Sequence, residues 1–235
     1  MPDERPRGLA KPAGRLYVIA TPIGNLSDIT LRAIDTLKSV DIIAAEDTRT
    51  SSILLNHFGI SKPMVSFHSH SGPGRANEII KKMMDGSSVG LITDAGTPGI
   101  SDPGYALVRE AVESGIEIVP VPGPAAFVTA LAASGLRTDR FVFEGFLPMK
   151  KGRQTKLRIL STENRTIVFY ESPHRILKTL GELEACFGDR RCVVARELTK
   201  IHETFYRGTF SRVLSQIGKS EPRGEFVIIV EGAEN

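Results

Sequence analysis

Short apolar runs alternate with amphipathic stretches along the chain as far as Gly135. The apolar runs predict strands at 16–20, 40–45, 64–67, 89–93 and 116–120. Apolar residues at helical spacing, such as Leu31, Ile34 and Leu37, predict a helix that Ser27 or Asp28 would cap. The same spacing predicts helices over 48–57, 75–84, 105–112 and 125–133. Strands that alternate with helices indicate a largely parallel sheet.

The pattern changes after a boundary near Gly135 to Arg140. Strands are predicted at 141–146, 166–170, 192–197, 203–208 and 225–230, and helices at 151–160, 173–184 behind Ser172, and 210–217. Neighbouring strands with no helix between them imply antiparallel pairing. We therefore predict an α/β protein with two α/β domains, a mainly parallel N-terminal sheet over 15–137 and a mixed C-terminal sheet over 138–235. Residues 1–14, rich in Pro, Arg, Gly and Lys, are expected to form a disordered tail.

Composition limits the classes of protein that fit. With 41% apolar and 24% charged residues, the chain has the composition of a soluble globular protein. No apolar run approaches the roughly 20 residues that span a bilayer, and the start has no signal-peptide region, so we expect a cytoplasmic protein without membrane contact. Cys186 and Cys192 are expected to be reduced thiols, and no Cys/His spacing suggests a metal. The net charge of +3 weakly favours an anionic partner.

A glycine- and proline-rich loop, Asp94–Gly104, joins a predicted strand to a predicted helix. An open α/β sheet binds ligands at the carboxyl ends of its strands, and a simple turn there usually needs only about 2 to 6 residues. We therefore interpret this loop as a ligand site and hold an ordinary turn as the alternative. Similar loops, 21–26 and 121–126, follow two other strands. Neither of these two has the three spaced glycines of a dinucleotide site, and the three loops together favour another cofactor.

Five motifs occur in order: Thr21–Leu26, Ala45–Arg49, Asp94–Gly104, Pro122–Ala126 and Phe169–Arg175. As a set they resemble the tetrapyrrole methylase superfamily, from about Arg15 to Gly232. Within it, the chain is similar to bacterial members that methylate the 2′-hydroxyl of a cytidine in small-subunit (16S) ribosomal RNA. The resemblance implies S-adenosylmethionine folded into a cleft between the two α/β domains, and a homodimer.

The matching motifs imply which residues hold the cofactor. They are Pro22 in the first loop, Asp94, Gly96, Thr97, Pro98, Gly99, Ile100 and Ser101 in the second, Pro124, Ala125 and Ala126 in the third, and Tyr170, Gly224, Glu225 and Phe226 in the second domain. Ala125 stands where the family leads us to expect a small hydroxyl residue. A carboxylate such as Asp94 suits the cationic or polar end of the cofactor.

A general base would assist methyl transfer to a hydroxyl group. Glu46 and Asp47, at a predicted strand end, and His68 and His70, which follow Phe67, are the catalytic candidates. Asp47 directly precedes a predicted helix, so a helix N-cap is an equally good interpretation of that residue.

RNA needs cations for its phosphates and flat groups for its unstacked bases. A dense basic run, Lys150, Lys151, Arg153, Lys156 and Arg158, lies beside Phe146 and Met149, although such a run usually means a solvated helix face. Arg49, Arg175, Arg196 and Lys200 would extend the RNA surface; Arg49 could instead pair with Glu46 or Asp47. Tyr170 and Phe205 are more often core than stacking residues.

The resemblance, together with these residues, implies an S-adenosylmethionine-dependent 2′-O-methyltransferase that acts on a cytidine of 16S ribosomal RNA in the small ribosomal subunit. One alternative keeps the fold and cofactor but methylates a carbon of a tetrapyrrole, or a protein side chain as in diphthine synthesis. A second alternative is an RNA chaperone that binds the cofactor without turnover. The basic run favours RNA, although an anionic macrocycle would also attract cations.

Overall fold

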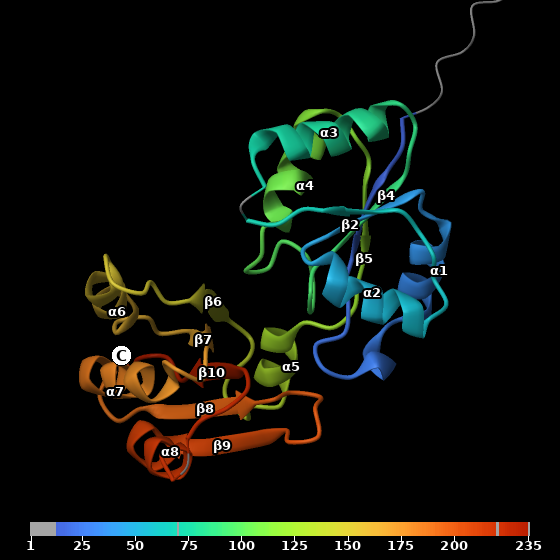
Figure 1. The fold of residues 1–235 in the computed structure, drawn as a ribbon. Coiled ribbons are helices and arrows are strands. Elements are labelled where there is room, and N and C mark those ends of the chain that lie inside the picture. Colours follow the sequence, from blue (N-terminus) through green and yellow to red (C-terminus); the bar gives the residue numbers. More distant parts are fainter. Residues whose placement is uncertain (1–12, 70, 220, 235) are drawn as a thin grey trace, which may run out of the picture. The chain divides into compact units, whose positions relative to one another are not determined.

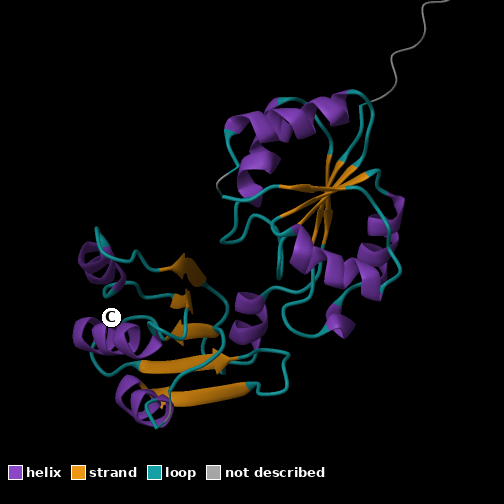
Figure 2. Ribbon diagram, in the orientation of Figure 1, coloured by secondary structure: helices purple, strands orange, loops and turns teal. Residues whose placement is uncertain are grey.

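Residues 13–69, 71–219 and 221–234 are described by a computed structural model, in which helices and strands divide into two units (Figures 1 and 2). One unit holds the chain up to Thr21 together with Asp28–Gly123, and the other holds Pro22–Ser27 together with the chain from Pro124 onward. The tail expected over 1–14 falls almost entirely outside the described residues. Among the helices described, none is long and apolar enough to cross a membrane.

The first unit is built on a fully parallel sheet. Its strands are β1 (Leu16–Ile19), β2 (Ile42–Ala45), β3 (Met64–Ser66), β4 (Val89–Ile92) and β5 (Ile118–Val121), in the order β3-β2-β4-β1-β5. All four residues of β4 are buried, as expected for a central strand with helices on both faces.

Helices cover both faces of this sheet (Figure 1). They are α1 (Leu31–Ser39) and α2 (Thr48–His57) on one face, and α3 (Pro73–Met84) and α4 (Gly104–Glu113) on the other. The alternation of strand side chains divides the core accordingly, since Ile43 packs with Leu37 of α1 while Ala44 packs with Met83 of α3.

The crossovers reverse direction at β4. Helices α1 and α2 carry the chain toward one edge of the sheet, and α3 and α4 carry it back across the other face. The loop after β4 therefore lies between the loops after β1 and β2, which lead to the opposite face. Open α/β sheets bind ligands at such a reversal.

The second unit has a mixed sheet. Its strands are β6 (Phe141–Phe146), β7 (Thr166–Glu171), β8 (Arg191–Arg196), β9 (Thr204–Thr209) and β10 (Phe226–Val230), in the order β6-β7-β10-β8-β9. β6 and β7 are parallel, and the other neighbours are antiparallel. The predicted fold class, two α/β domains with one parallel and one mixed sheet, is confirmed.

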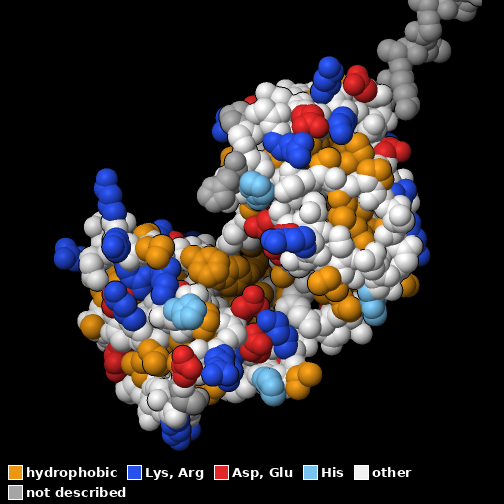
Figure 3. Space-filling view, viewed as in Figure 1, with side chains coloured by type: hydrophobic (Ala, Val, Ile, Leu, Met, Phe, Trp, Pro, Cys, Tyr) orange, Lys and Arg blue, Asp and Glu red, His pale blue; other side chains and the backbone are white. Residues whose placement is uncertain are grey.

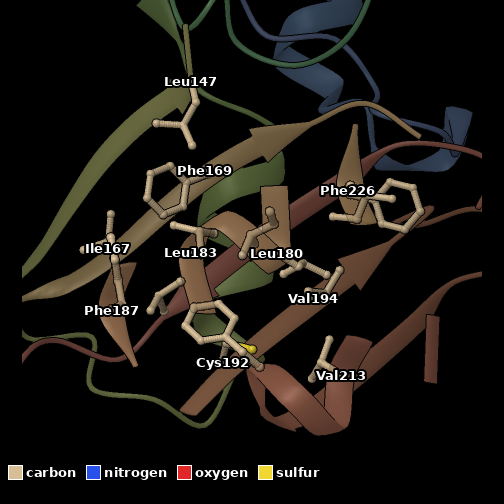
Figure 4. Close-up of a cluster of buried hydrophobic side chains, with 14 of the residues drawn as sticks. Leu147, Ile167, Phe169, Leu180, Leu183, Phe187, Cys192, Val194, Val213 and Phe226 are labelled. Carbon is tan, nitrogen blue, oxygen red and sulfur yellow. The ribbon is translucent and has the colours of Figure 1, made fainter. Parts of the chain in front are cut away.

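Two apolar cores sandwich the second sheet. On one face lie α6 (Arg153–Leu160), α7 (Ile176–Phe187) and α8 (Phe210–Ile217), and Figure 4 shows Phe169 of β7 pointing toward Leu180 and Leu183 of α7. On the other face lie the short helix α5 (Ala126–Ala132) and Ile23. Helix α5 thus packs on the second sheet, although it precedes the boundary expected near residue 137.

Two expected helix starts differ from the structure. Helix α1 is capped by Thr30, whose side chain accepts a hydrogen bond from Ala33 N at 3.1 Å, and not by Ser27 or Asp28. Helix α7 begins at Ile176, because Ser172 O accepts from the N–H groups of Arg175 and Ile176 and closes a turn first. Both differences are local, since they depend on which of several polar residues caps the helix.

Candidate functional site

The loop that follows β4 is tied to the loop that follows β1. Thr21 and Gly96 exchange backbone hydrogen bonds of 2.9 and 3.0 Å, and Thr21 Oγ1 donates to Thr93 O at 3.1 Å. Because Thr21 and Thr93 are buried, these bonds are shielded from water. The first residue of loop 21–26 is therefore fixed to the loop that follows β4.

The far end of the β4–α4 loop is organised by Asp102. Its Oδ1 accepts from Gly99 N at 2.8 Å and from Gly104 N at 2.7 Å, which joins the middle of the loop to the first residue of α4. A Cβ atom on Gly104 would lie 2.9 Å from the backbone nitrogen of Gly99, so the loop favours glycine there. Ser101 adopts a φ of 64°, a left-handed conformation that is uncommon for serine. The loop thus has one fixed shape.

Three carboxylates gather at the ends of the adjacent strands β2 and β4. Glu46 Oε2 accepts a 2.6 Å bond from Thr93 Oγ1, and Asp94 Oδ1 accepts from Asp47 N at 3.1 Å. Partial burial is the main cause that raises the pKa of Asp94, and the charges of Glu46 and Asp47 add to it. A cation placed beside Asp94 would relieve this repulsion.

Asp47 caps helix α2, which is the alternative interpretation considered for it. Its Oδ1 accepts from Arg49 N at 2.8 Å, and its Oδ2 pairs with the Arg49 guanidinium at 2.7 Å. Hydrogen bonds from Arg49 lower the pKa of Asp47 to about 2. Such an acid is a poor proton acceptor near neutral pH.

Of the two histidine candidates, the structure describes only His68. His68 is exposed after β3, and its backbone N–H donates to Ser71 Oγ at 2.9 Å. His70 lies outside the described residues.

In the second unit, the candidates Ala125 and Tyr170 meet at the start of α5. Ala125 is the N-cap residue and has no side chain that can accept a hydrogen bond. The Tyr170 hydroxyl oxygen accepts from Phe127 N at 3.2 Å and so replaces a conventional cap. Burial raises the pKa of Tyr170, which keeps the hydroxyl neutral. Tyr170 of β7 therefore supplies the hydroxyl that caps α5.

The loop between β8 and β9 forms an ion-pair network with the residues before β10. Lys200 Nζ lies 2.8 Å from Glu197 Oε1 and 2.9 Å from Glu225 Oε2, and Glu225 N donates to Glu197 Oε1 at 3.0 Å. Burial disfavours ionisation of Glu197, but the bonds from Lys200 and Glu225 outweigh it and lower the pKa of Glu197. A Cβ on Gly224 would lie 2.4 Å from that side chain. Lys200, expected on the RNA surface, is instead neutralised within this network.

Arg153 is buried and paired, which corrects the expectation that its charge is available to RNA. Only 5% of the residue is exposed, and its guanidinium binds Glu182 at 2.6 Å, Thr179 Oγ1 at 2.8 Å and Pro148 O at 3.1 Å. The sequence pattern could not reveal this, because Glu182 and Thr179 lie on another helix.

Arg175 has a similar structural role. Its guanidinium donates to Leu147 O at 2.8 Å and lies 3.3 Å from the buried carboxylate of Glu171. Thr179 Oγ1 donates to that carboxylate at 2.6 Å and so links Arg175 to Arg153. The two arginines therefore fix the backbone of the loop between β6 and α6.

The other basic candidates reach solvent. Lys150 and Lys151 are exposed, and among the described residues no carboxylate lies within ion-pair distance of either. Arg49 is exposed but pairs with Asp47. Arg196 Nε donates to Arg223 O at 2.7 Å, which leaves part of its guanidinium for another partner.

The sequence interpretation missed several residues that organise these loops. They are Thr21, Thr93, Asp102, Glu171, Thr179 and Glu197. The Asp-Pro-Gly at 102–104 was the one usable signal, since Asp before Pro-Gly often accepts backbone bonds in a turn. No group of three or more possible metal ligands occurs in the part of the chain that the structure describes.

Known proteins resemble this chain over most of its length. The model of the tetrapyrrole (corrin/porphyrin) methylase family matches residues 15–214. A Synechocystis protein named ribosomal RNA small subunit methyltransferase I is 51% identical over 222 residues, which cover 94% of this chain and 80% of that protein. The protein of that name from Thermotoga maritima is 48% identical, with coverage of 94% of this chain and 100% of the relative.

Solved structures show the same fold at low sequence identity. Diphthine synthase has a TM-score of 0.74 at 14% identity, with 93% of this chain and 90% of that chain covered. Uroporphyrin-III C-methyltransferase from Thermus thermophilus, complexed with S-adenosyl homocysteine, has a TM-score of 0.66 at 18% identity, with coverage of 93% and 97%. This chain therefore belongs to the tetrapyrrole methylase family. Its cofactor is S-adenosylmethionine, as the sequence motifs predicted.

Proposed function

We propose that this chain transfers a methyl group from S-adenosylmethionine to the 2′-hydroxyl of a cytidine in 16S ribosomal RNA. The observation that carries the proposal is the identity of about half of all residues, over nearly the whole chain, with proteins named ribosomal RNA small subunit methyltransferase I. The enzyme would act in the cytoplasm on an assembled small subunit.

The residues at the end of β4 suit the cofactor chemically. Bound S-adenosylmethionine supplies an activated methyl group on a sulfonium cation. Asp94, next to Glu46 and Asp47, provides the negative charge that a cationic ligand needs, and the rigid loop from Gly96 to Ser101 provides backbone groups for adenosine. In the second unit, Pro22, Pro124–Ala126, Tyr170, Gly224 and Glu225 remain proposed cofactor contacts. The expectation for Phe226 is corrected, because its side chain is buried in the apolar core with α7.

Methyl transfer to a ribose hydroxyl is a displacement that depends mainly on positioning. Among the proposed acid–base residues, Glu46 is the best candidate to accept the hydroxyl proton. A hydrogen bond from Thr93 orients its carboxylate, and its other oxygen has no competing hydrogen-bond donor among the described residues. Asp47 already forms an ion pair with Arg49 and caps the N-terminus of α2. His68 remains an alternative base, and His70 is proposed on the sequence alone.

RNA would bind through lysines of the second unit. Lys150 and Lys151 are exposed and have no acidic partner among the described residues, so their charges are available for phosphates. Arg49 and Arg196 are further proposed contacts, each with part of its guanidinium exposed. A tetrapyrrole or a protein side chain is the weaker candidate substrate, since the structures that suggest them are at most 20% identical to this chain.

The enzyme would act as a homodimer. Leu31 of α1 is 81% exposed and Ile53 of α2 is 69% exposed, and both helices cover the same face of the first sheet. Large apolar side chains that remain exposed on one face favour burial against a second copy of the chain.

The proposal is tested by incubating the protein with methyl-labelled S-adenosylmethionine and small ribosomal subunits from cells that lack this activity. We expect label in 16S RNA, and little label when large subunits or a tetrapyrrole precursor replace the small subunit. Glu46→Gln should lower the rate by roughly 10² to 10⁴ with cofactor affinity retained. Labelling of the tetrapyrrole in place of RNA would disprove the proposal.

A further inference from the structure

Strand β6 contains a β-bulge that changes the direction of one aromatic side chain. Phe143 pairs with Val168 of β7, but Gly145 pairs with the next residue, Phe169, so Glu144 is the extra residue. Gly145 has a φ of 60°, which suits glycine in a bulge. Without the extra residue, Phe146 would point to the α7 face; with it, Phe146 pairs with Tyr170 and shares the α5 face with Phe143.

The result is a row of aromatic rings that ends in solvent. Phe127 of α5 stacks on Phe143 with 4.5 Å between ring centroids, and Tyr170 lies 5.1 Å from Phe143 and 5.6 Å from Phe146. Helix α5 spans only residues 126–132, and Phe146 at the end of the row is 54% exposed. Figure 3 shows hydrophobic side chains gathered beside β6, with Lys and Arg side chains near them.

The loop that follows Phe146 is held from within. Leu147 is buried in the core, its carbonyl accepts from Arg175, and the Pro148 carbonyl accepts from Arg153. The position of Phe146 is thus fixed from both sides, by the bulge before it and by these bonds after it. A rigid aromatic ring loses little entropy when a flat ligand stacks on it.

The charge beside this ring indicates what occupies it. Met149 is 76% exposed, and Lys150 and Lys151 follow it without an acidic partner among the described residues. An exposed ring a few residues from two available cations matches the pairing of base and phosphate in single-stranded nucleic acid.

We propose that Phe146 stacks on an unpaired base of the substrate RNA while Lys150 and Lys151 contact its phosphates. The inference rests on the proposed function for the identity of the RNA, but not for the stacking itself. It gives the bulge a role, since the bulge turns Phe146 onto the face that also carries Tyr170.

The chain contains no tryptophan, so a single one introduced at this site reports on it alone. Phe146→Trp should lose most of its fluorescence when oligocytidylate is added, because a stacked base quenches indole. Ile159→Trp is the matched control, since Ile159 is 63% exposed on α6 beside Arg158 but has no place in the aromatic row. Its fluorescence should be unchanged. Inorganic polyphosphate, which has charge without bases, should quench neither.

Other occupants of the ring give different results, and each would overturn the proposal. Equal quenching of both tryptophans, or quenching by polyphosphate, would mean that charge alone attracts the ligand, without stacking. Quenching by S-adenosylhomocysteine without RNA would assign the ring to the cofactor's adenine. A concentration-dependent emission shift without RNA would assign the ring to a second copy of the chain.

Turnover provides an independent test. Phe146→Ala should raise the KM for small subunits about five- to hundredfold while cofactor affinity stays the same, and Phe146→Tyr should restore most of the loss. An unchanged KM for Phe146→Ala would reject stacking and leave the proposed function intact. If the wild type methylates no ribosomal RNA, the proposed function fails while the fluorescence titration still decides the stacking.

Discussion

Asp94 illustrates how one residue can serve both the fold and the ligand. One carboxylate oxygen accepts from Asp47 N, and partial burial raises the pKa of Asp94 above its ordinary value. A raised pKa means that the folded protein favours the neutral acid, so this group adds stability at low pH and loses it as pH rises through the folded pKa. The charged form that a sulfonium needs is therefore held at some cost in stability.

Asp94→Asn should weaken S-adenosylmethionine binding about ten- to hundredfold, because it removes a charge beside a cationic ligand but keeps the acceptor for Asp47 N. Calorimetric titration measures this, with Asp35→Asn on the exposed face of α1 as the control. Wild-type affinity should fall on acidification through the raised pKa of Asp94, and the Asn variant should lack that step. Equal affinities for wild type and variant would refute the placement of the cofactor.

Arg153 and Lys151 are two residues apart and have opposite roles. Arg153→Met should reduce the free energy of unfolding by about 3 to 5 kcal/mol, because it leaves Glu182 without its buried partner. Lys151→Met should leave stability nearly unchanged and weaken RNA binding. Urea denaturation and RNA titration of both variants measure this, and a stable Arg153→Met protein with impaired RNA binding would contradict the assignment.

At the scale of elements, the shape of the β4–α4 loop depends on one side chain. Asp102→Ala should release Gly99 N and Gly104 N, so that amide exchange in the loop accelerates and cofactor affinity falls several-fold. Asp102→Asn keeps an oxygen acceptor and should behave nearly as wild type. Hydrogen exchange with calorimetry distinguishes them; unchanged exchange in the Ala variant would show that Asp102 does not organise the loop.

The helices and strands were largely predictable, because the spacing of apolar residues and the glycines that end helices are local signals. The Asp94–Gly104 loop was recognisable from its length and composition alone. Which loops lie beside it was not predictable, since the strand order β2-β4-β1 is set by the packing of residues far apart in the chain. The same limit explains Arg153 and Lys200, whose charges looked available in sequence but are neutralised by Glu182 and by Glu197 with Glu225.

At the scale of the whole molecule, RNA affinity should depend on salt through the available lysines. Replacing Lys150 and Lys151 together by Ala should reduce the slope of log affinity against log salt by about one to two units, because each phosphate contact releases condensed counterions. Fluorescence anisotropy with 16S RNA fragments at several salt concentrations measures the slope. Identical slopes for the wild type and the double variant would show that this segment is an ordinary solvated surface.

The proposed homodimer makes a separate prediction. Wild type at micromolar concentration should sediment with twice the chain mass, and the double variant Leu31→Asp with Ile53→Asp should sediment as a monomer. Val112→Asp, which removes a 60% exposed apolar residue from α4 on the other sheet face, is the matched control and should remain dimeric. A wild-type monomer with full methylation activity would exclude a functional dimer.

The central claim is tested most directly by finding the atom that receives the methyl group. Small subunits methylated by the wild type with labelled S-adenosylmethionine would be digested to nucleosides, and the labelled nucleoside identified by mass spectrometry. The account predicts label in 2′-O-methylcytidine from 16S RNA, absent when Glu46→Gln replaces the wild type. Label on a base carbon or nitrogen, on another nucleoside or on ribosomal protein would contradict it.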